Sequence, residues 1–162
     1  LLLSSLREMI DYESSFKKDC NITVLFEIYK MFKDNQNIKI STISLIGKIC
    51  HARTDIKPSD NELICNYLME LFQYEQSDIE VLCHVLNAII DVYSVDEYND
   101  ILFKSKFIEI LINGNFINNL SNQIKTLYSQ KVINAEVKQF CKDLTTNLKA
   151  FISYKQKIFK NN

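Results

Sequence analysis

The sequence predicts an all-α protein, a HEAT/armadillo-type solenoid of antiparallel helix pairs. Apolar residues recur every three or four positions along nearly the whole chain, and strict alternation over strand-length windows is absent. The 162 residues include only 2 Gly and 1 Pro, too few for the tight turns of a sheet-rich fold. Helix pairs with similar apolar patterns follow each other at about 40 residues, the period of HEAT and armadillo repeats.

Composition and size describe a chain that folds around a core of its own. Hydrophobic residues make up 47% and charged residues 24%, as in ordinary globular proteins. The five cysteines form no CxxC pair, which is typical of buried thiols in a protein of the cytoplasm and nucleus. The apolar runs are too short to span a bilayer, and the chain starts on Leu without a signal peptide. We therefore expect one segment over 1–162, the C-terminal part of a longer protein that does not bind membranes.

The first helices follow in order from their apolar stripes. After a helix near residues 2–13, the first pair is joined by a turn at 34–37. Its stripes are Val24, Leu25, Ile28, Met31 and Phe32, then Ile40, Ile43, Ile46, Ile49 and Cys50. The second pair is joined through 76–78, where Ser77 or Asp78 is expected to cap the second helix. Its stripes are Leu63, Ile64, Tyr67, Leu68, Leu71 and Phe72, then Val81, Leu82, Val85, Leu86, Ile89 and Val92.

The last third of the chain is also predicted to be helical. Past an acidic connection at 95–100, helical spacing continues from Ile101 to Leu111 and breaks at 113–115 around Gly114. A long final helix carries the clearest stripe, Val137, Phe140, Cys141, Leu144, Leu148, Phe151 and Ile152. We expect repeats over about 21–52, 61–93 and 101–128, and a capping helix over about 134–158.

The two complete pairs align with each other. Residues 21–32 match 61–72 at an offset of 40, and the second helices match at an offset of 43. The matched positions are Val24/Ile64, Ile28/Leu68, Met31/Leu71 and Phe32/Phe72, then Ile43/Leu86, Ile46/Ile89 and Ile49/Val92. Any two amphipathic helices share a period and so match in part. The alternation of short turn and long loop repeats as well, which favours true repeats that bury their faces by stacking.

The sequence contains no residue pattern of an enzyme or a metal site. The GxSxG, HExxH, P-loop and GxGxxG motifs are absent, so we expect no catalysis and no cofactor. His51 and His84 each follow a cysteine, and adjacent side chains on a helix point about 100° apart. Neither pair can therefore chelate a metal alone, and we interpret Cys50, Cys83 and both histidines as structural.

Charge is unevenly distributed along the chain, although the net charge is −1. Residues 55–100 contain eleven acids and one Lys, whereas residues 122–162 contain eight Lys and two acids. The acidic segment would attract a basic partner, although Glu62, Glu70 and Glu75 are equally well explained by solubility. The C-terminal lysines have no interleaved Arg, so we expect them to cap the solenoid and not to bind nucleic acid.

The predicted protein-binding site consists of Asn87, Asp91, Asp96, Glu97, Tyr98 and Asp100. In armadillo repeats the second helix faces the groove, and Asp91 falls where such repeats carry a groove Asn, with Asn87 one turn earlier. The other four residues follow in a loop, where repeat proteins tend to place binding groups. Their carboxylates can pair with Lys or Arg of a partner, and Tyr98 is expected to stack on a guanidinium.

The second half of the chain resembles a known family. The stretches HVLNAIIDVYSVDEYNDILFKSKFIEIL and NLKAFISYKQK are similar, in order and spacing, to the C-terminal region of the symportin family of HEAT/armadillo adaptors. The matched elements are Leu86, Asn87, Ala88, Ile89, Asp91, Tyr93, Asp96, Tyr98, Asp100, Phe103 and Phe107, then Asn147, Leu148, Phe151, Ile152, Tyr154 and Lys155. The resemblance implies a chaperone that carries newly made ribosomal proteins of the large-subunit 5S particle into the nucleus with an importin. The importin contact is expected in the N-terminal armadillo half, outside this chain.

Two functions are compatible with these observations. Ribosomal proteins are strongly basic, so an acidic cradle would screen them until rRNA replaces it. The alternative is a generic scaffold or regulatory subunit that holds a partner helix or peptide in an apolar groove. The salt dependence of binding distinguishes the two functions, because an apolar groove keeps its affinity for the partner at high salt.

Overall fold

The computed structural model describes residues 22–52, 58–94, 96–105, 107–113 and 115–161, apart from the side chains of residues 58–60, 97 and 161. In this part of the chain every regular element is a helix. The elements are α3 (Ile22–Met31), α4 (Gln36–Ala52), α5 (Pro58–Tyr74), α6 (Ile79–Tyr93), the 3-10 helix η1 (Asp96–Tyr98), α7 (Asn99–Lys104), α8 (Phe107–Ile112), α9 (Phe116–Ser129) and α10 (Ala135–Asn161). The helix expected near 2–13 lies outside the described residues. The predicted all-α solenoid is confirmed.

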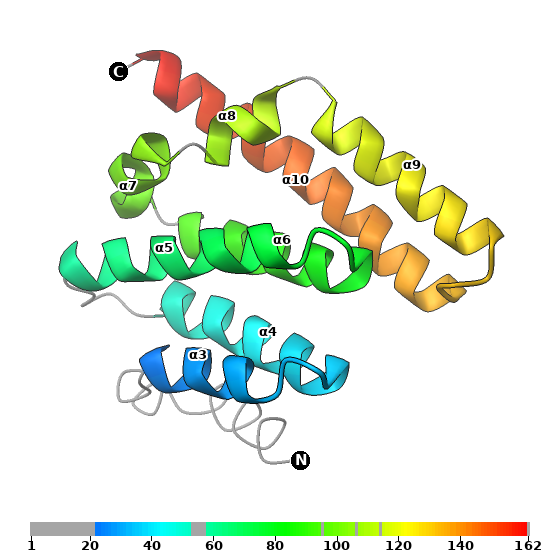
Figure 1. Cartoon of the computed structure of the whole chain (residues 1–162). Helices are drawn as coiled ribbons and strands as arrows, with labels where there is room; N and C mark the ends of the chain where they lie inside the picture. The colour runs from blue at the N-terminus through cyan, green and yellow to red at the C-terminus, as the bar shows by residue number, and fades with distance from the viewer. Residues whose placement is uncertain (1–21, 53–57, 95, 106, 114, 162) are drawn as a thin grey trace.

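The helices form two layers (Figure 1). Helices α3 and α5 lie in one layer, and α4, α6 and α10 lie behind them in the other, which we call the second-helix layer. Helix α6 packs against α4, α5, α9 and α10, so it lies at the centre of the molecule. Its buried side chains are Ile79, Val81, Leu82, Cys83, Val85, Leu86, Ala88, Ile89, Val92 and Tyr93.

Short polar side chains begin three of the helices. Asp78 accepts a hydrogen bond from the backbone N–H of Val81 at 3.3 Å and is the N-cap of α6, as predicted. Asn35 before α4 and Asn134 before α10 each accept the N–H three residues on, at 3.1 and 2.8 Å. Helix α5 begins at Pro58, whose fixed φ suits the first position of a helix. Local sequence therefore sets where these helices start.

A close backbone contact joins α4 to α6. A Cβ added to Gly47 would come within 2.9 Å of the Ala88 Cα, closer than real Cβ atoms approach a neighbour. Because glycine has no Cβ, the two backbones can come this near. The positions matched at the offset of 43 are all buried, Ile43, Ile46 and Ile49 on α4 and Leu86, Ile89 and Val92 on α6. The two helices therefore pack as equivalent elements of successive pairs.

The buried face of α3 differs from the predicted stripe. Its buried side chains are Ile22, Leu25, Phe26 and Tyr29. Its exposed apolar side chains are Val24, Met31 and Phe32, which are 52%, 74% and 43% exposed. The Phe26 ring stacks on Tyr67 of α5 with centroids 3.9 Å apart, and this contact fixes which face of α3 points inward. The match of α3 to α5 at an offset of 40 is therefore wrong, because it pairs exposed residues with buried ones.

The segment from Ile101 to Leu111 is two helices and not the predicted one. Ser105 adopts an extended backbone after Lys104 and ends α7, and its hydroxyl donates to the carbonyl of Leu102 at 2.6 Å. A serine that bonds to nearby backbone competes with the helix, which explains the break. The predicted repeat over 101–128 thus contains three helices, α7, α8 and α9.

A buried ion pair joins the first two helix pairs. Lys39 of α4 donates to both carboxylate oxygens of Glu75, at 2.9 and 3.1 Å, and the Tyr29 hydroxyl donates to Glu75 at 2.6 Å. The side chains of Lys39 and Glu75 are 11% and 3% exposed. Burial, reinforced by Glu75, raises the pKa of Tyr29 well above its ordinary range, so its hydroxyl stays a donor. Three elements, α3, α4 and the end of α5, are held by this one carboxylate.

We expect Gly47→Ala to lower the free energy of unfolding by about 1–3 kcal/mol, despite the higher helix propensity of alanine. The added methyl group meets the Ala88 backbone, which cannot move without displacing α6. Urea denaturation measures the effect. Ser44→Ala, on the same helix and half-buried, is the control and should change stability by less than about 0.5 kcal/mol. A variant as stable as the wild type would contradict the close contact.

We expect Glu75→Gln to cost about 3–5 kcal/mol, because Lys39 is left buried without an anion. Thermal and urea unfolding measure the loss. The double variant Lys39→Met/Glu75→Leu, which removes both charges, should regain most of it. Glu70→Gln removes an exposed carboxylate from the same helix and serves as the control. If Glu75→Gln were no worse than this control, the ion pair would not stabilise the fold.

Candidate protein-binding surface

The predicted site residues of α6 belong to the second-helix layer. Asn87 and Asp91 are half-buried and one turn apart on α6. Lys48 of α4 lies close enough to act electrostatically on Asp91, and His51 of α4 is also near. We call the surface made by these four residues and Ser94 the second-helix face. It combines side chains from two successive pairs, as a repeat-protein binding surface does.

The Asp91 carboxylate is partly removed from water. Burial raises the pKa of Asp91 above its ordinary value, while His51 and Lys48 act in the opposite direction. One carboxylate oxygen lies 3.3 Å from the place of a Cβ on Gly47, so the close contact between α4 and α6 positions it. A charge pair formed at a half-buried carboxylate is less screened than one in open solvent. Asp91 can therefore bind a cationic side chain of a partner.

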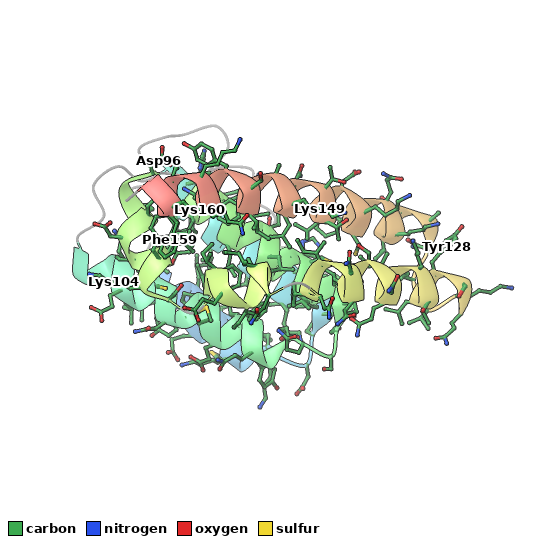
Figure 2. All side chains as sticks on the ribbon, turned by 90° about the horizontal axis from the view of Figure 1, so that it is seen from above. Asp96, Lys104, Tyr128, Lys149, Phe159 and Lys160 are labelled. Atoms are coloured by element: carbon green, nitrogen blue, oxygen red, sulfur yellow. The ribbon has the colours of Figure 1, made fainter. Side chains whose placement is uncertain are left out.

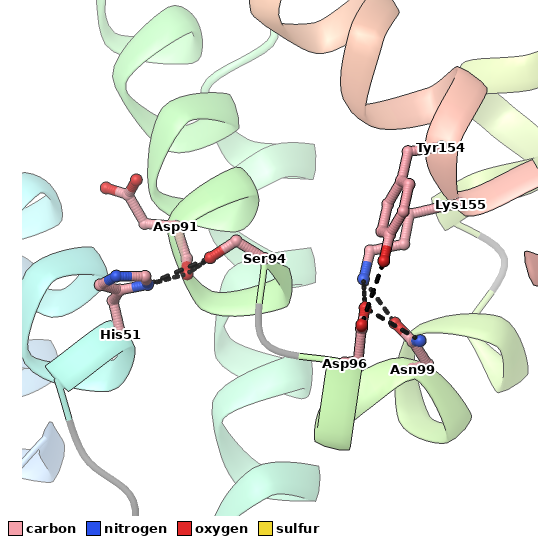
Figure 3. Close-up of polar contacts among 7 residues, drawn as sticks. All are labelled: His51, Asp91, Ser94, Asp96, Asn99, Tyr154 and Lys155. Atoms are coloured by element: carbon pink, nitrogen blue, oxygen red, sulfur yellow. Dashed lines mark hydrogen bonds and ion pairs between the residues drawn. The ribbon is translucent and has the colours of Figure 1, made fainter.

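Ser94, His51 and Asp91 meet, but not as a hydrolytic triad (Figure 3). The His51 Nδ1 lies 3.1 Å from the Ser94 Oγ and 3.1 Å from the main-chain oxygen of Asp91. The Ser94 hydroxyl donates to that same main-chain oxygen at 2.8 Å. A nucleophilic serine would give its proton to a histidine whose other nitrogen is held by a carboxylate. These contacts instead fasten α4 to the end of α6.

Asp96 forms an ion pair within the molecule (Figure 3). Its carboxylate accepts hydrogen bonds from the Tyr154 hydroxyl at 3.1 Å and from the Lys155 ammonium at 3.2 Å. The side chain of Lys155 is fully buried, and its ammonium also donates to the side-chain oxygen of Asn99 at 2.5 Å. These bonds hold the pKa of Asp96 below its ordinary value, whereas burial lowers the pKa of Lys155. Asp96 therefore anchors α10 to η1 and is not a free carboxylate.

The remaining loop residues differ in their exposure. Tyr98 is only 4% exposed and belongs to the core, so the expected stacking on a partner's guanidinium is wrong. A buried aromatic ring stabilises the turn by its apolar contacts, which explains the inward placement. Asp100, in the first turn of α7, is exposed. The side chain of Glu97 lies outside the described residues.

The acid-rich segment does not form one continuous cradle within the described residues. Glu75 is buried against Lys39 and unavailable to a partner. Glu62 and Glu70 are exposed on α5, in the layer opposite to the one that carries Asp91. The negative charge is thus divided between two layers, because these acids lie on different helices, Glu62 and Glu70 on α5 and Asp91 on α6.

Sequence reasoning missed two buried lysines. Lys39 precedes Ile43 by four residues, and Lys155 follows Phe151 by four, so each falls on an apolar stripe. A lysine is rarely buried unless it is paired. A lysine on a stripe is therefore the signal that predicts an ion pair, although it does not identify the acid.

The two Cys-His pairs are parts of the packed helices. Cys50, Cys83 and Cys141 are buried free thiols, and His84 stacks on Phe140 of α10 with centroids 4.2 Å apart. Among the described residues, no group of three or more His, Cys, Asp or Glu could hold a metal ion. None of the helices in these ranges combines the length and hydrophobicity needed to cross a bilayer.

The family described as SYO1-like, TPR repeats matches residues 2–158 of the chain. The match includes both helix layers and the second-helix face. Like HEAT and armadillo repeats, TPR repeats are antiparallel helix pairs that bury their faces by stacking, in agreement with the observed layers. No curated protein and no solved structure matches the chain.

We expect Asp96→Asn to destabilise the chain, because a fully buried lysine loses its anion. The pKa of Asp96 is lowered in the folded state, so its stabilisation is present above the unfolded pKa of about 4. It is lost as pH falls through the folded pKa. Thermal unfolding between about pH 3 and pH 7 should therefore show a smaller pH dependence for the variant than for the wild type.

Asp100→Asn is the matched control for this experiment, because it removes an exposed carboxylate four residues away. It should change stability by less than about 0.5 kcal/mol. The double variant Asp96→Asn/Lys155→Met should be more stable than Asp96→Asn alone, since the buried charge is gone. Equal stability of Asp96→Asn and the wild type would contradict the anchoring role.

Proposed function

The chain belongs to the SYO1-like, TPR-repeat family, the symportin family, and from this membership we propose that it is a non-catalytic adaptor for basic ribosomal proteins. Its cargo would be newly made proteins of the large-subunit 5S particle, bound for nuclear import and ribosome assembly. The family match over residues 2–158 is the observation that carries this proposal. An adaptor with this cargo would act in both the cytoplasm and the nucleus.

The second-helix face offers the chemistry that a basic cargo needs. Asn87 and Asp91 present an amide and a half-buried carboxylate one turn apart. Glu80 lies further along the same side of α6, where burial raises its pKa and Gln36 of α4 donates to it at 2.9 Å. Each carboxylate can bind a Lys or Arg side chain through a charge-assisted hydrogen bond. We propose that these residues of α6, together with Asp100, contact the cargo.

Several weak pairs must act together for useful affinity. An exposed ion pair contributes about 0.2–1 kcal/mol, and somewhat more where water is partly excluded. Binding should therefore weaken as salt rises, because screening acts on every pair at once. Asp96, Tyr98 and Glu75 do not enter this set, since the first two stabilise the turn before α7 and the third is buried.

A second candidate function is supported by an apolar pocket between α3 and α5. The pocket has a volume of about 240 Å³ and is lined by Phe26, Tyr29, Lys30, Lys33, Tyr67, Glu70, Leu71 and Tyr74. Aromatic pockets of this kind hold an apolar side chain of a partner peptide. This observation favours the generic scaffold, whose affinity would persist at high salt.

The double variant Glu80→Gln/Asp91→Asn tests the proposal. We expect it to weaken binding of a purified 5S-particle ribosomal protein by about three- to tenfold at low salt. Isothermal titration calorimetry at two salt concentrations measures the affinity. The matched control Glu62→Gln/Glu70→Gln removes the same charge from exposed positions in the opposite layer and should bind nearly as the wild type does.

Three outcomes would contradict the proposal. Unchanged binding by the α6 variant would show that the cargo does not bind at the second-helix face. An equal loss in both variants would show an effect of net charge, or binding at the pocket between α3 and α5, which Glu70 lines. Undiminished affinity at high salt would favour the scaffold function and the pocket between α3 and α5.

A further inference from the structure

A groove lined by lysines runs between α9 and α10. It has a volume of about 610 Å³, and its floor includes the buried residues Ile124 and Thr145. Its walls carry Asn118, Ser121, Asn122 and Lys125 from α9, and Lys138, Lys142, Thr146 and Lys149 from α10. All remaining lining groups are amides, hydroxyls or alkyl groups, and no carboxylate lines it. The groove is thus a concentrated positive site on a chain whose net charge is −1.

The lysines of this groove are not neutralised within the described residues. Lys125, Lys142 and Lys149 are exposed, and none of their side-chain ammonium groups has a hydrogen bond or ion pair there. Lys138 is half-buried and lies over the Tyr128 ring, with its ammonium 4.0 Å from the ring centroid. Asp143, which follows Lys142 in the sequence, accepts instead from Gln139 at 2.9 Å.

Sequence spacing shows that this arrangement is unlike a solvated helix surface. Such surfaces mix both signs of charge and place an acid three or four residues from a lysine. In this groove, the residues three and four positions before and after each of the four lysines are neutral or are another lysine. Lys138 and Lys142 repel each other across one turn, which destabilises α10 in the free protein. An anionic ligand would relieve that repulsion.

We infer that this groove binds an acidic peptide segment of a partner protein. The lysines of α10 from Lys138 to Lys149 span about 16 Å along the helix axis. An extended peptide covers this distance with about five residues, so acids at alternate positions would face the lysines. The side-chain amides of Asn118 and Asn122 can donate further hydrogen bonds to carboxylates or to the peptide backbone. This binding is separate from that of a basic cargo, because it uses the opposite charge and different helices.

The groove fits carboxylates better than a nucleic acid. Proteins that hold single strands stack the bases on aromatic side chains, and no aromatic residue lines this groove. Arginine, which pairs bidentately with phosphate, is absent from the lining as well. A long polyanion would also meet the acids elsewhere on a chain with a pI of about 6.2.

Fluorescence anisotropy on the whole chain tests this inference. The probe is a labelled peptide of about ten residues that alternates Glu and Ser. The variant Lys125→Gln/Lys142→Gln/Lys149→Gln should bind it about tenfold more weakly, and wild-type affinity should fall as salt rises. The control Lys104→Gln/Lys157→Gln/Lys160→Gln removes three exposed lysines and should bind within about twofold of the wild type. Lys104 and Lys160 lie away from Lys149, toward the C-terminal end of α10 (Figure 2).

Two further probes complete the test. The same peptide with Gln in place of Glu should not bind, and a single-stranded uridine oligonucleotide of equal charge should bind more weakly than the Glu peptide. Acetylation of the wild-type chain should be slowed by the Glu peptide at Lys125, Lys142 and Lys149. Equal binding by the groove variant and the wild type, or an equal loss in the control variant, would overturn the inference. Tighter binding of the oligonucleotide would replace it with a nucleic-acid site.

Discussion

The contact between Gly47 and Ala88 is the constraint on which the rest of the structure depends. It brings α4 and α6 together at backbone distance, and α6 in turn packs on α5, α9 and α10. The same contact places one carboxylate oxygen of Asp91 near α4, where Lys48 and His51 act on it electrostatically. A side chain at position 47 would separate the helices and with them the residues of the second-helix face. Core packing and the binding surface therefore have a common origin.

Two buried lysines tie distant parts of the chain to this layer. Lys39 joins the first pair to the end of α5 through Glu75, and Lys155 joins α10 to η1 through Asp96 and to α7 through Asn99. A buried charge is tolerated only when it is paired, so each ion pair favours one arrangement of the helices that it joins. Glu75 and Asp96 look like surface charges in the sequence, but both stabilise the fold. The charges left for partners are therefore fewer than the composition indicates, and they lie on separate faces.

The sequence predicts long helices well and their exposed faces less well. The stripes of α6 and α10 identify buried residues because those helices pack on several sides. The stripe of α3 fails because Val24, Met31 and Phe32 share its period but lie outside the contact made by Phe26 with Tyr67. At the candidate site, Asn87 and Asp91 follow from helical periodicity. The role of Asp96 does not, because it depends on Tyr154 and Lys155 of α10, which are more than fifty residues away in the chain. The burial of Tyr98 does not follow from the loop pattern either.

The break at Ser105 has a mechanical consequence for the solenoid. A stack of helix pairs bends when neighbouring helices slide past each other, and the close contact of Gly47 with Ala88 opposes sliding of α4 along α6. Helices α7 and α8, by contrast, are six residues each, and the extended Ser105 ends the first of them. A change in curvature that adapts the molecule to partners of different shape would therefore concentrate at this joint. The solenoid would then bend at one place, between α7 and α8, while the layer of α4 and α6 stays rigid.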